Sequence, residues 1–298
     1  MHSNVKSIQE YLEEGYCSPT ACQLMLAGRL KYLRENVAKL TSAAAAKAIG
    51  VSRPQLSRLE TAQRRWSEDQ LLRALRLYGV GSPGDEELGR RLLRISGQPE
   101  WTASFRADAL PKWFEHFVEL ESVAEHIRSF ETRAVHGLLQ SPSYAHAVIA
   151  GDGRMSADLV QRRLALRQER QRRVLREGGP TVWVVLEEAV LLRRFAEPHA
   201  MREQLLYLKN LVEDNPRVKV QILPDDLAVN RPSSAFTYLK FNLRHVPDKV
   251  YLELPYRGIY QDDRDDVESQ REALDNLAAV AYREDETAGI LARRIKEF

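Results

Sequence analysis

The sequence predicts a mixed fold in which an all-α domain is followed by a larger α/β (α+β) domain with a small sheet. Apolar residues recur at helical spacing over roughly the first hundred residues. Strand-length segments rich in β-branched and aromatic residues follow residue 180, and a break containing Gly and Pro at 97–99 interrupts the pattern. At 298 residues the chain is long enough to build two domains with separate cores.

Four segments are expected in chain order. They are a polar lead-in at 1–26, a helical domain at 27–96, a linker at 97–109 and an α/β domain at 110–298. From the end of the lead-in, helical spacing continues through Leu26, Leu30, Leu33 and Val37, and short helical segments follow as far as about Ile95.

The second domain is expected to alternate helices with short strands. Its predicted helices are 113–133, 142–150, 156–177, 198–213, 266–282 and 287–296. Its predicted strands are 181–186, 218–223, 236–241 and 250–254. This order indicates helices packed around a small sheet.

Composition favours a cytoplasmic protein that does not enter a membrane. Hydrophobic residues make up 44% of the chain and charged residues 29%, and no apolar run approaches the roughly 20 residues of a membrane span. The first residues do not combine a basic start with an apolar run, as a secretory signal would. The two cysteines, Cys17 and Cys22, are read as reduced thiols, and neither a metal site nor a cofactor is expected.

Charge is unevenly distributed along the chain. Residues 1–96 hold 15 Lys and Arg against 10 Asp and Glu, whereas the remainder holds 29 against 32. Within 27–80 the ratio is 11 basic to 4 acidic residues. A basic module suits binding to a polyanion such as nucleic acid, although a solvated basic surface explains the same counts without a ligand.

Residues 41–60 have the spacing of a helix-turn-helix. Two short helices that cross closely need a small residue at the crossing, which Ala46 supplies. Gly50 follows where the first helix must end with a positive φ, and Val51 is expected to enter the core. Leu56 and Leu59 would turn the apolar side of the second helix inward. The alternative is a helical domain that uses this turn only for packing.

The second helix of this motif presents a set of side chains suited to reading DNA. Ser52 is a good N-cap, and Pro54 falls in the first helical turn. Arginine can bridge guanine O6 and N7, and glutamine can pair with adenine. The expected base-reading residues are Arg53, Gln55, Ser57 and Arg58. The expected phosphate contacts, at the motif's entrance and exit, are Ser42, Lys47, Arg64 and Arg65.

Residues 50–60, with Arg64, Arg65 and the helix ending at 77–80, resemble the Cro/lambda-repressor (XRE) class. The resemblance implies a five-helix lambda-repressor-like domain that binds operator DNA as a homodimer. Further segments are similar to the C-terminal domain of actinobacterial antitoxin-like XRE regulators: 127–131, 137–145, 167–171, 188–191, 201–205 and 218–224. In that family a neighbouring gene often encodes a small protein, so the resemblance implies a protein partner for the C-terminal domain.

Three positions depart from the family pattern. Ser42 stands where many members have glutamine, which weakens one expected DNA contact. Ala62 replaces the glycine usually found after the second motif helix, and His136 replaces a frequent proline.

The sequence therefore predicts a DNA-binding transcriptional regulator, associated with the nucleoid when bound, whose C-terminal domain binds a small partner protein. The alternative is a ligand-responsive regulator with a pocket lined by aromatic residues that suit a core equally well: Trp183, Phe236, Tyr238, Phe241, Tyr251, Tyr256 and Tyr260. An enzyme is not expected, because no HExxH, GxSxG or P-loop pattern is present. The acidic cluster 262–266 suits a helix start better than Mg²⁺.

Overall fold

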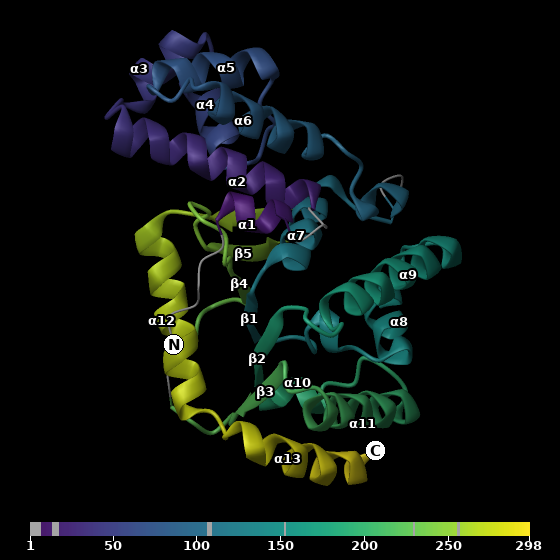
Figure 1. Cartoon of the computed structure of the whole chain (residues 1–298). Helices are drawn as coiled ribbons and strands as arrows, with labels where there is room; N and C mark the ends of the chain where they lie inside the picture. Colours follow the sequence, from purple (N-terminus) through teal and green to yellow (C-terminus); the bar gives the residue numbers. More distant parts are fainter. Residues whose placement is uncertain (1–6, 14–17, 106–108, 152, 229, 255–256) are drawn as a thin grey trace. The chain divides into compact units, whose positions relative to one another are not determined.

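The computed structural model describes residues 7–13, 18–105, 109–151, 153–228, 230–254 and 257–298. It divides into two compact units. One unit comprises Met1–Trp101 together with Phe241–Pro247, and the other comprises Thr102–Lys240 with Asp248–Phe298. Cys17, expected to be a reduced thiol, and Tyr256, considered for a ligand pocket, lie outside the described residues. The first unit is helical and the second is α/β, so the predicted fold class is confirmed (Figure 1).

Short helices build the first unit. They are α1 (Ile8–Glu13), α2 (Pro19–Tyr32), α3 (Ser42–Ile49), α4 (Arg53–Glu60), α5 (Glu68–Leu77) and α6 (Pro83–Ile95), and a π-helical turn (Leu33–Val37) extends α2. The N-caps of α2 to α6 are Ser or Thr, and each side chain accepts a hydrogen bond from the backbone N–H three residues later. Proline in the first turn of α2, α4 and α6 adds to these local start signals.

Helix α2 begins inside the segment that was expected to be a polar lead-in. Ser18 caps it, and the buried carboxylate of Glu100 holds its first turn. Glu100 Oε1 accepts hydrogen bonds from Ser18 Oγ at 3.0 Å, from Thr20 N at 2.8 Å and from Thr20 Oγ1 at 2.7 Å. Because these partners lie about 80 residues apart in sequence, the pattern around Ser18 gave no sign of them.

The second unit alternates helices and strands, after a short 3-10 turn (Trp101–Phe105) where the units divide. Its helices are α7 (Lys112–Val123), α8 (Pro142–Ala150), α9 (Ala157–Val174), α10 (Glu188–Leu192), α11 (Pro198–Asp214), α12 (Arg264–Val280) and α13 (Thr287–Arg294). Its strands are β1 (His126–Glu131), β2 (Thr181–Glu187), β3 (Val218–Leu223), β4 (Phe236–Lys240), β5 (Lys249–Leu254) and β6 (Arg257–Gln261). Further 3-10 turns lie at Gly137–Leu139, Glu284–Glu286 and Ile295–Glu297.

The six strands form one mixed sheet in the order β3-β2-β1-β4-β5-β6. Strands β1, β2 and β3 run parallel, whereas β4 is antiparallel to β1 and the β4-β5-β6 ribbon is antiparallel throughout. Helices α8 and α9 connect β1 to β2, and α10 and α11 connect β2 to β3. Phe130 lies opposite Val185 on one side and Phe236 on the other, so β1 is a central strand.

The helix predicted over 113–133 is wrong in its second half. Helix α7 ends at Val123, Ala124 turns to extended backbone with ψ 151°, and His126–Glu131 forms β1. Hydrogen bonding to β2 and β4 on both sides overrides the helical spacing of the apolar residues in this segment. The edge strand β6 was not predicted either, because it is short and carries Gly258.

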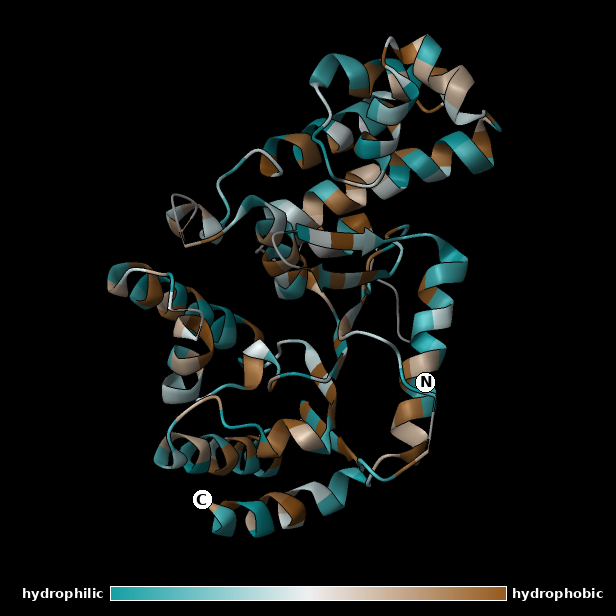
Figure 2. Ribbon diagram, turned by 180° about the vertical axis from the view of Figure 1, so that it is seen from behind, coloured by the Kyte–Doolittle hydropathy of each residue, from teal (hydrophilic) through white to brown (hydrophobic). Residues whose placement is uncertain are grey.

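The core of the second unit lies on both faces of the sheet. On one face Phe130, Tyr238 and Val250 pack against α12. On the opposite face Tyr251 stacks on Phe117 of α7, with ring centroids 4.0 Å apart. Figure 2 shows hydrophobic residues along the strands and hydrophilic residues on the outer turns of the helices around them. None of the described helices is long and apolar enough to cross a membrane.

Candidate DNA-binding surface

The turn between α3 and α4 depends on Gly50. This residue has φ 80° and ψ 37°, a left-handed conformation that a side chain would strain. Its N–H donates to Ala46 O at 3.0 Å and to Lys47 O at 3.3 Å, and Val51 N donates to Ala46 O at 3.0 Å. The last carbonyls of α3 are therefore satisfied within the turn.

The motif residues expected inside the unit are mostly buried. Leu56 and Leu59 are completely buried, and Ala46 is 3% exposed. Val51, which was expected to enter the core, is only half-buried. Burial of one face of α4 leaves its opposite face available to a partner.

The exposed face of α4 carries the residues expected to read bases. Arg53, Ser57 and Arg58 are exposed, whereas Gln55 is half-buried. The Ser52 hydroxyl accepts from Gln55 N at 3.3 Å, which fixes the start of the helix. Arg58 Nε donates only a long 3.4 Å hydrogen bond to Pro54 O within the same helix.

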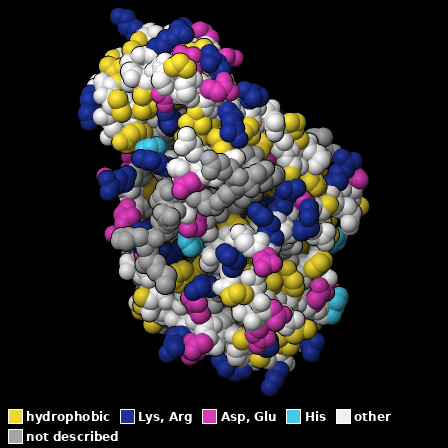
Figure 3. All heavy atoms as spheres, in the orientation of Figure 1, with side chains coloured by type: hydrophobic (Ala, Val, Ile, Leu, Met, Phe, Trp, Pro, Cys, Tyr) yellow, Lys and Arg dark blue, Asp and Glu magenta, His cyan; other side chains and the backbone are white. Residues whose placement is uncertain are grey.

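Several cations on and beside α3 and α4 have no acidic partner among the described residues. Within the described part of the chain, Lys47, Arg53, Arg58 and Arg64 form no ion pair. Other arginines of this unit do pair, as in Arg29–Asp85, Arg34–Glu60, Arg73–Asp69 and Arg90–Glu68. Figure 3 shows Lys and Arg side chains around the end of the molecule formed by α3 to α5, beside acidic ones. Unpaired exposed cations are free to neutralise phosphates.

The residues expected to contact phosphates occupy different settings. Ser42 is half-buried in the first turn of α3, behind the cap Thr41, and Lys47 is exposed farther along the helix. Arg64 is exposed in the loop after α4. Arg65 instead donates from Nη2 to Leu93 O at 3.1 Å, so its guanidinium already has a partner at the end of α6.

A buried ion pair that the sequence reasoning missed holds the C-terminal end of α4. Arg34 Nε and Nη2 donate to the two carboxylate oxygens of Glu60 at 2.6 and 2.8 Å, and Arg34 Nη1 donates to Leu40 O at 3.0 Å. The Glu60 carboxylate thereby raises the pKa of Arg34. Leu40 lies just before α3, so one guanidinium fixes the start of α3 against the end of α4.

Two further hydrogen bonds hold the segment that follows α4. Gln23 Nε2 of α2 donates to Ala62 O at 2.6 Å, and Trp66 Nε1 donates to Leu59 O at 3.2 Å. Ala62 has φ 60°, which is why glycine suits this position in the proteins that the motif resembles.

Among the described aromatic residues considered for a ligand pocket, Trp183 lines a hollow of about 660 Å³ together with Asp275 and Arg283, which are charged and not aromatic. Tyr238 and Tyr251 lie on opposite faces of the sheet, each within packed side chains. Trp183 is half-buried and donates from Nε1 to Gln221 Oε1 at 3.0 Å.

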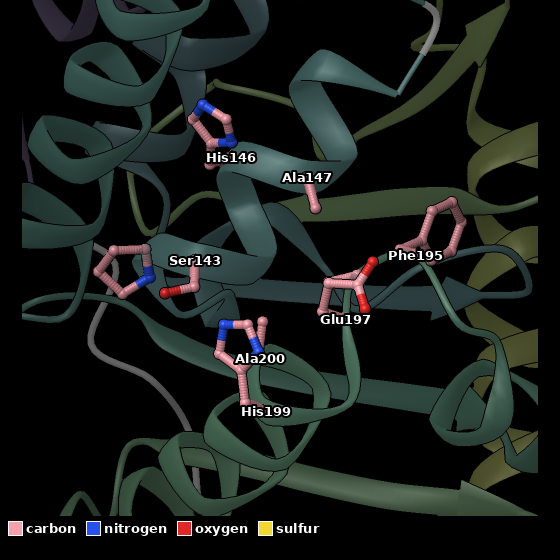
Figure 4. A pocket seen from close by; sticks show the side chains of 9 residues that line it. Ser143, His146, Ala147, Phe195, Glu197, His199 and Ala200 are labelled. Atoms are coloured by element: carbon pink, nitrogen blue, oxygen red, sulfur yellow. The ribbon is translucent and has the colours of Figure 1, made fainter. Parts of the chain in front are cut away.

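A hollow of about 590 Å³ lies elsewhere in this unit, between α8 and the start of α11. Figure 4 shows Ser143, His146 and Ala147 of α8 on one side of it, with Glu197 and His199 on the other. Within the described residues, no group of three His, Cys, Asp or Glu is placed to hold a metal ion.

Comparison with protein families gives two matches. A family described as a domain of unknown function (DUF5753) matches residues 114–293, and a helix-turn-helix domain matches residues 25–92. The second match confirms the helix-turn-helix that the sequence predicts. No curated protein and no solved structure matches the chain.

Proposed function

The chain belongs to the DUF5753 family and carries a helix-turn-helix domain, and we propose that it is a sequence-specific transcriptional regulator of the XRE class. The observation that carries this proposal is the exposed face of α4, where Arg53 and Arg58 have no acidic partner within the described part of the chain. We propose that it acts in the cytoplasm on nucleoid DNA, without catalytic activity or cofactor.

Base reading and phosphate binding are assigned to different side chains. Arg53 and Arg58, with Gln55 and Ser57 between them, lie on the helix that would enter the major groove. Ser42, Lys47 and Arg64 flank that helix and would contact the DNA backbone. Arg65 would contribute less, because reaching a phosphate would cost its hydrogen bond to Leu93 O.

The test begins with selection of preferred duplexes from a randomised library by the full chain. Arg58→Ala should weaken binding to the selected duplex by about 1 to 3 kcal/mol and relax preference at one base pair. Arg64→Ala should weaken selected and scrambled duplexes alike, and should lower the slope of log K against log salt by roughly 1.

Arg94→Ala is the matched control, because Arg94 is an exposed arginine of α6 in the same unit, 3.6 Å from Glu87. It should leave affinity nearly unchanged. Absence of any preferred duplex, or equal losses for Arg58→Ala on both DNAs with Arg64→Ala affecting only the selected one, would contradict the assignment.

For the C-terminal unit we propose binding of a small protein encoded by a neighbouring gene, as the antitoxin-like resemblance implies. The full chain co-expressed with the neighbour's product should purify as a heterocomplex of fixed stoichiometry. Separation of the two proteins on a sizing column at micromolar concentration would contradict this proposal.

A second candidate function, response to a small molecule, is favoured by the hollow between α8 and α11. Its volume of about 590 Å³ falls in the range of small-molecule sites, and its lining combines Phe195 with the polar His146 and His199. Filling it with Ala147→Trp should abolish any effect of a metabolite on DNA affinity while basal DNA binding persists. A metabolite response that survives Ala147→Trp would exclude this hollow as its site.

A further inference from the structure

The first unit, which carries the helix-turn-helix and is called the DNA-binding unit below, contains a segment from far along the sequence. The segment Phe241–Pro247, which joins β4 to β5, belongs to the same compact unit as Met1–Trp101. Its apolar side chains are nearly completely buried: Phe241, Leu243 and Val246. Val246 N donates to Leu243 O at 3.1 Å, so the segment is an ordered, packed loop.

Gly28 in α2 marks the place where this loop meets the helix. A Cβ built on Gly28 would lie 2.0 Å from the backbone oxygen of His245 and 2.8 Å from its carbonyl carbon, closer than real Cβ contacts. Glycine is unfavourable inside a helix, yet Gly28 occupies a buried interior position of α2. The close approach of the His245 backbone explains why the helix has glycine here.

The His245 side chain makes a second contact with the same helix. Its ring stacks on Tyr32 with centroids 4.0 Å apart and planes 25° apart. His245 itself has φ 64°, an unfavourable backbone conformation for a residue with a side chain. Packing against α2 therefore holds the loop in a shape that it would not adopt by preference.

Helix α2 and its π-helical extension are in turn bonded to the DNA-reading helix. Gln23 of α2 binds Ala62 O just after α4, and Arg34 binds Glu60 at the end of α4. A continuous series of contacts within this unit thus leads from His245 through α2 to α4.

We propose that the 241–247 loop is a coupling element through which changes in β4 and β5 alter α2 and the position of α4. The effect on DNA rests on the proposed function, whereas the coupling itself is measured without DNA. Such coupling is expected where two elements share packed contacts that break and form together.

Gly28→Ala in the full chain should change Tm in opposite directions, depending on whether helix propensity or the close contact with the His245 backbone dominates. If helix propensity alone mattered, alanine would raise Tm. Because the Cβ meets the His245 backbone, Tm should instead fall by about 2 to 4 °C or more. The control is Gly289→Ala in α13, where a Cβ meets only the end of the Arg293 side chain at 4.0 Å, and Tm should hold or rise.

Amide hydrogen exchange then tests the coupling. Gly28→Ala should speed exchange in β4 and β5 as well as in α2 and α4, whereas Gly289→Ala should not. A rise in Tm for Gly28→Ala, or faster exchange confined to α2 and α4, would overturn the proposal. If the wild-type chain selects no DNA, the proposed function fails while the exchange result still decides the coupling.

Tyr32→Ala serves as the milder variant if Gly28→Ala does not fold. Loss of the ring stack should speed exchange in β4 and β5 roughly 2- to 10-fold. Tyr32→Phe keeps the ring and should leave exchange unchanged. Unchanged exchange in β4 and β5 for Tyr32→Ala would likewise overturn the proposal.

Discussion

Lys39 and Ala62 flank the helix-turn-helix, and both have left-handed backbones. Lys39 has φ 53° just before α3, and Ala62 has φ 60° just after α4. An L-residue in this conformation carries a steric cost that glycine avoids. Lys39 is exposed, so its side chain contributes little packing to offset that cost.

Lys39→Gly should therefore raise the free energy of unfolding by about 0.5 to 1 kcal/mol, because relief of the left-handed strain exceeds the added chain entropy of glycine. Ala48→Gly is the control at an exposed position inside α3, and it should lower the same quantity by about 0.5 to 1 kcal/mol. Urea unfolding of both variants gives the comparison. Equal losses for the two would show that Lys39 is not strained.

Glu131 is a half-buried carboxyl, with its side chain 17% exposed, and its protonation should make stability depend on pH. Burial, followed by the nearby charge of Glu253, raises the pKa of Glu131 to about 8. The folded chain then binds more protons than the unfolded chain between pH 4.5 and 8, so this contribution to stability is full below pH 4.5 and is lost as pH rises to 8. Burial lowers the pKa of His136 to about 3, and its contribution changes only below about 6.5.

Between pH 6.5 and 8 the titration of Glu131 therefore acts without that of His136, and the free energy of unfolding should fall by up to about 1.4 kcal/mol per pH unit. Glu131→Gln mimics the neutral carboxyl and should make this fall shallower, whereas Glu121 and Glu253, whose pKa values burial also raises, should leave a residual fall. Thermal unfolding across this pH range measures both proteins. An identical slope for wild type and Glu131→Gln would assign the pH dependence to other groups.

Among the elements, α4 depends on a partner 26 residues earlier in the chain, because Arg34 holds Glu60 in a site where both side chains are at most 7% exposed. Glu60→Leu removes the buried carboxylate and leaves the Arg34 guanidinium only the exposed Glu35 carboxylate at 2.8 Å, so it should lower the free energy of unfolding by about 3 kcal/mol. Asp69→Ala breaks an exposed pair with Arg73 and should cost less than about 1 kcal/mol.

The double variant Arg34→Met with Glu60→Leu separates stability from helix placement. It should regain most of the lost stability, because no buried charge remains unpaired. Its DNA affinity should stay below that of the wild type, because the Arg34 guanidinium that binds both Glu60 and Leu40 O, and so fixes α4 against α3, is gone. A Glu60→Leu loss as small as that of Asp69→Ala would contradict this role.

Element prediction from sequence succeeded where local pattern and tertiary structure agree. Strands β2 to β5 are short, apolar and bounded by turns, and α4 has its cap, proline and leucine spacing within eight residues. Strand β1 was read as helix because Phe117, Leu120, Ala124 and Ile127 continue a helical spacing across the break after Val123. Its neighbours β2 and β4 begin more than 50 residues later, so no local signal announces their pairing.

In the candidate site, too, local sequence pattern predicted some features, and contacts between distant residues set the others. The exposed residues of α4 follow from spacing alone, whereas the Arg34–Glu60 pair, the partner of Arg65 and the loop at Gly28 all depend on contacts between distant residues. Gly28 was a usable signal, because glycine is unfavourable inside a helix and its presence there points to a packing constraint. The sequence could not say which backbone would approach.

For the molecule as a whole, one helix-turn-helix buries too little surface for tight binding, so we expect a homodimer on a nearly palindromic site. Half-sites should lie about 10 base pairs apart, or a multiple of that. Sedimentation of the full chain with and without the selected duplex measures the stoichiometry. A monomer at micromolar concentration that stays monomeric on DNA would rule out this assembly.

The two-piece construction of the DNA-binding unit has a consequence for synthesis on the ribosome. Its first piece ends at Trp101, and its second begins at Phe241, about 140 residues later. At elongation speeds of about 5 to 20 residues per second this separation corresponds to roughly 7 to 28 s during which the Gly28 surface of the nascent chain has no loop to cover it. Maturation of this unit must therefore wait until the 241–247 loop has been made, so a truncated product that stops before residue 241 carries an uncovered helix.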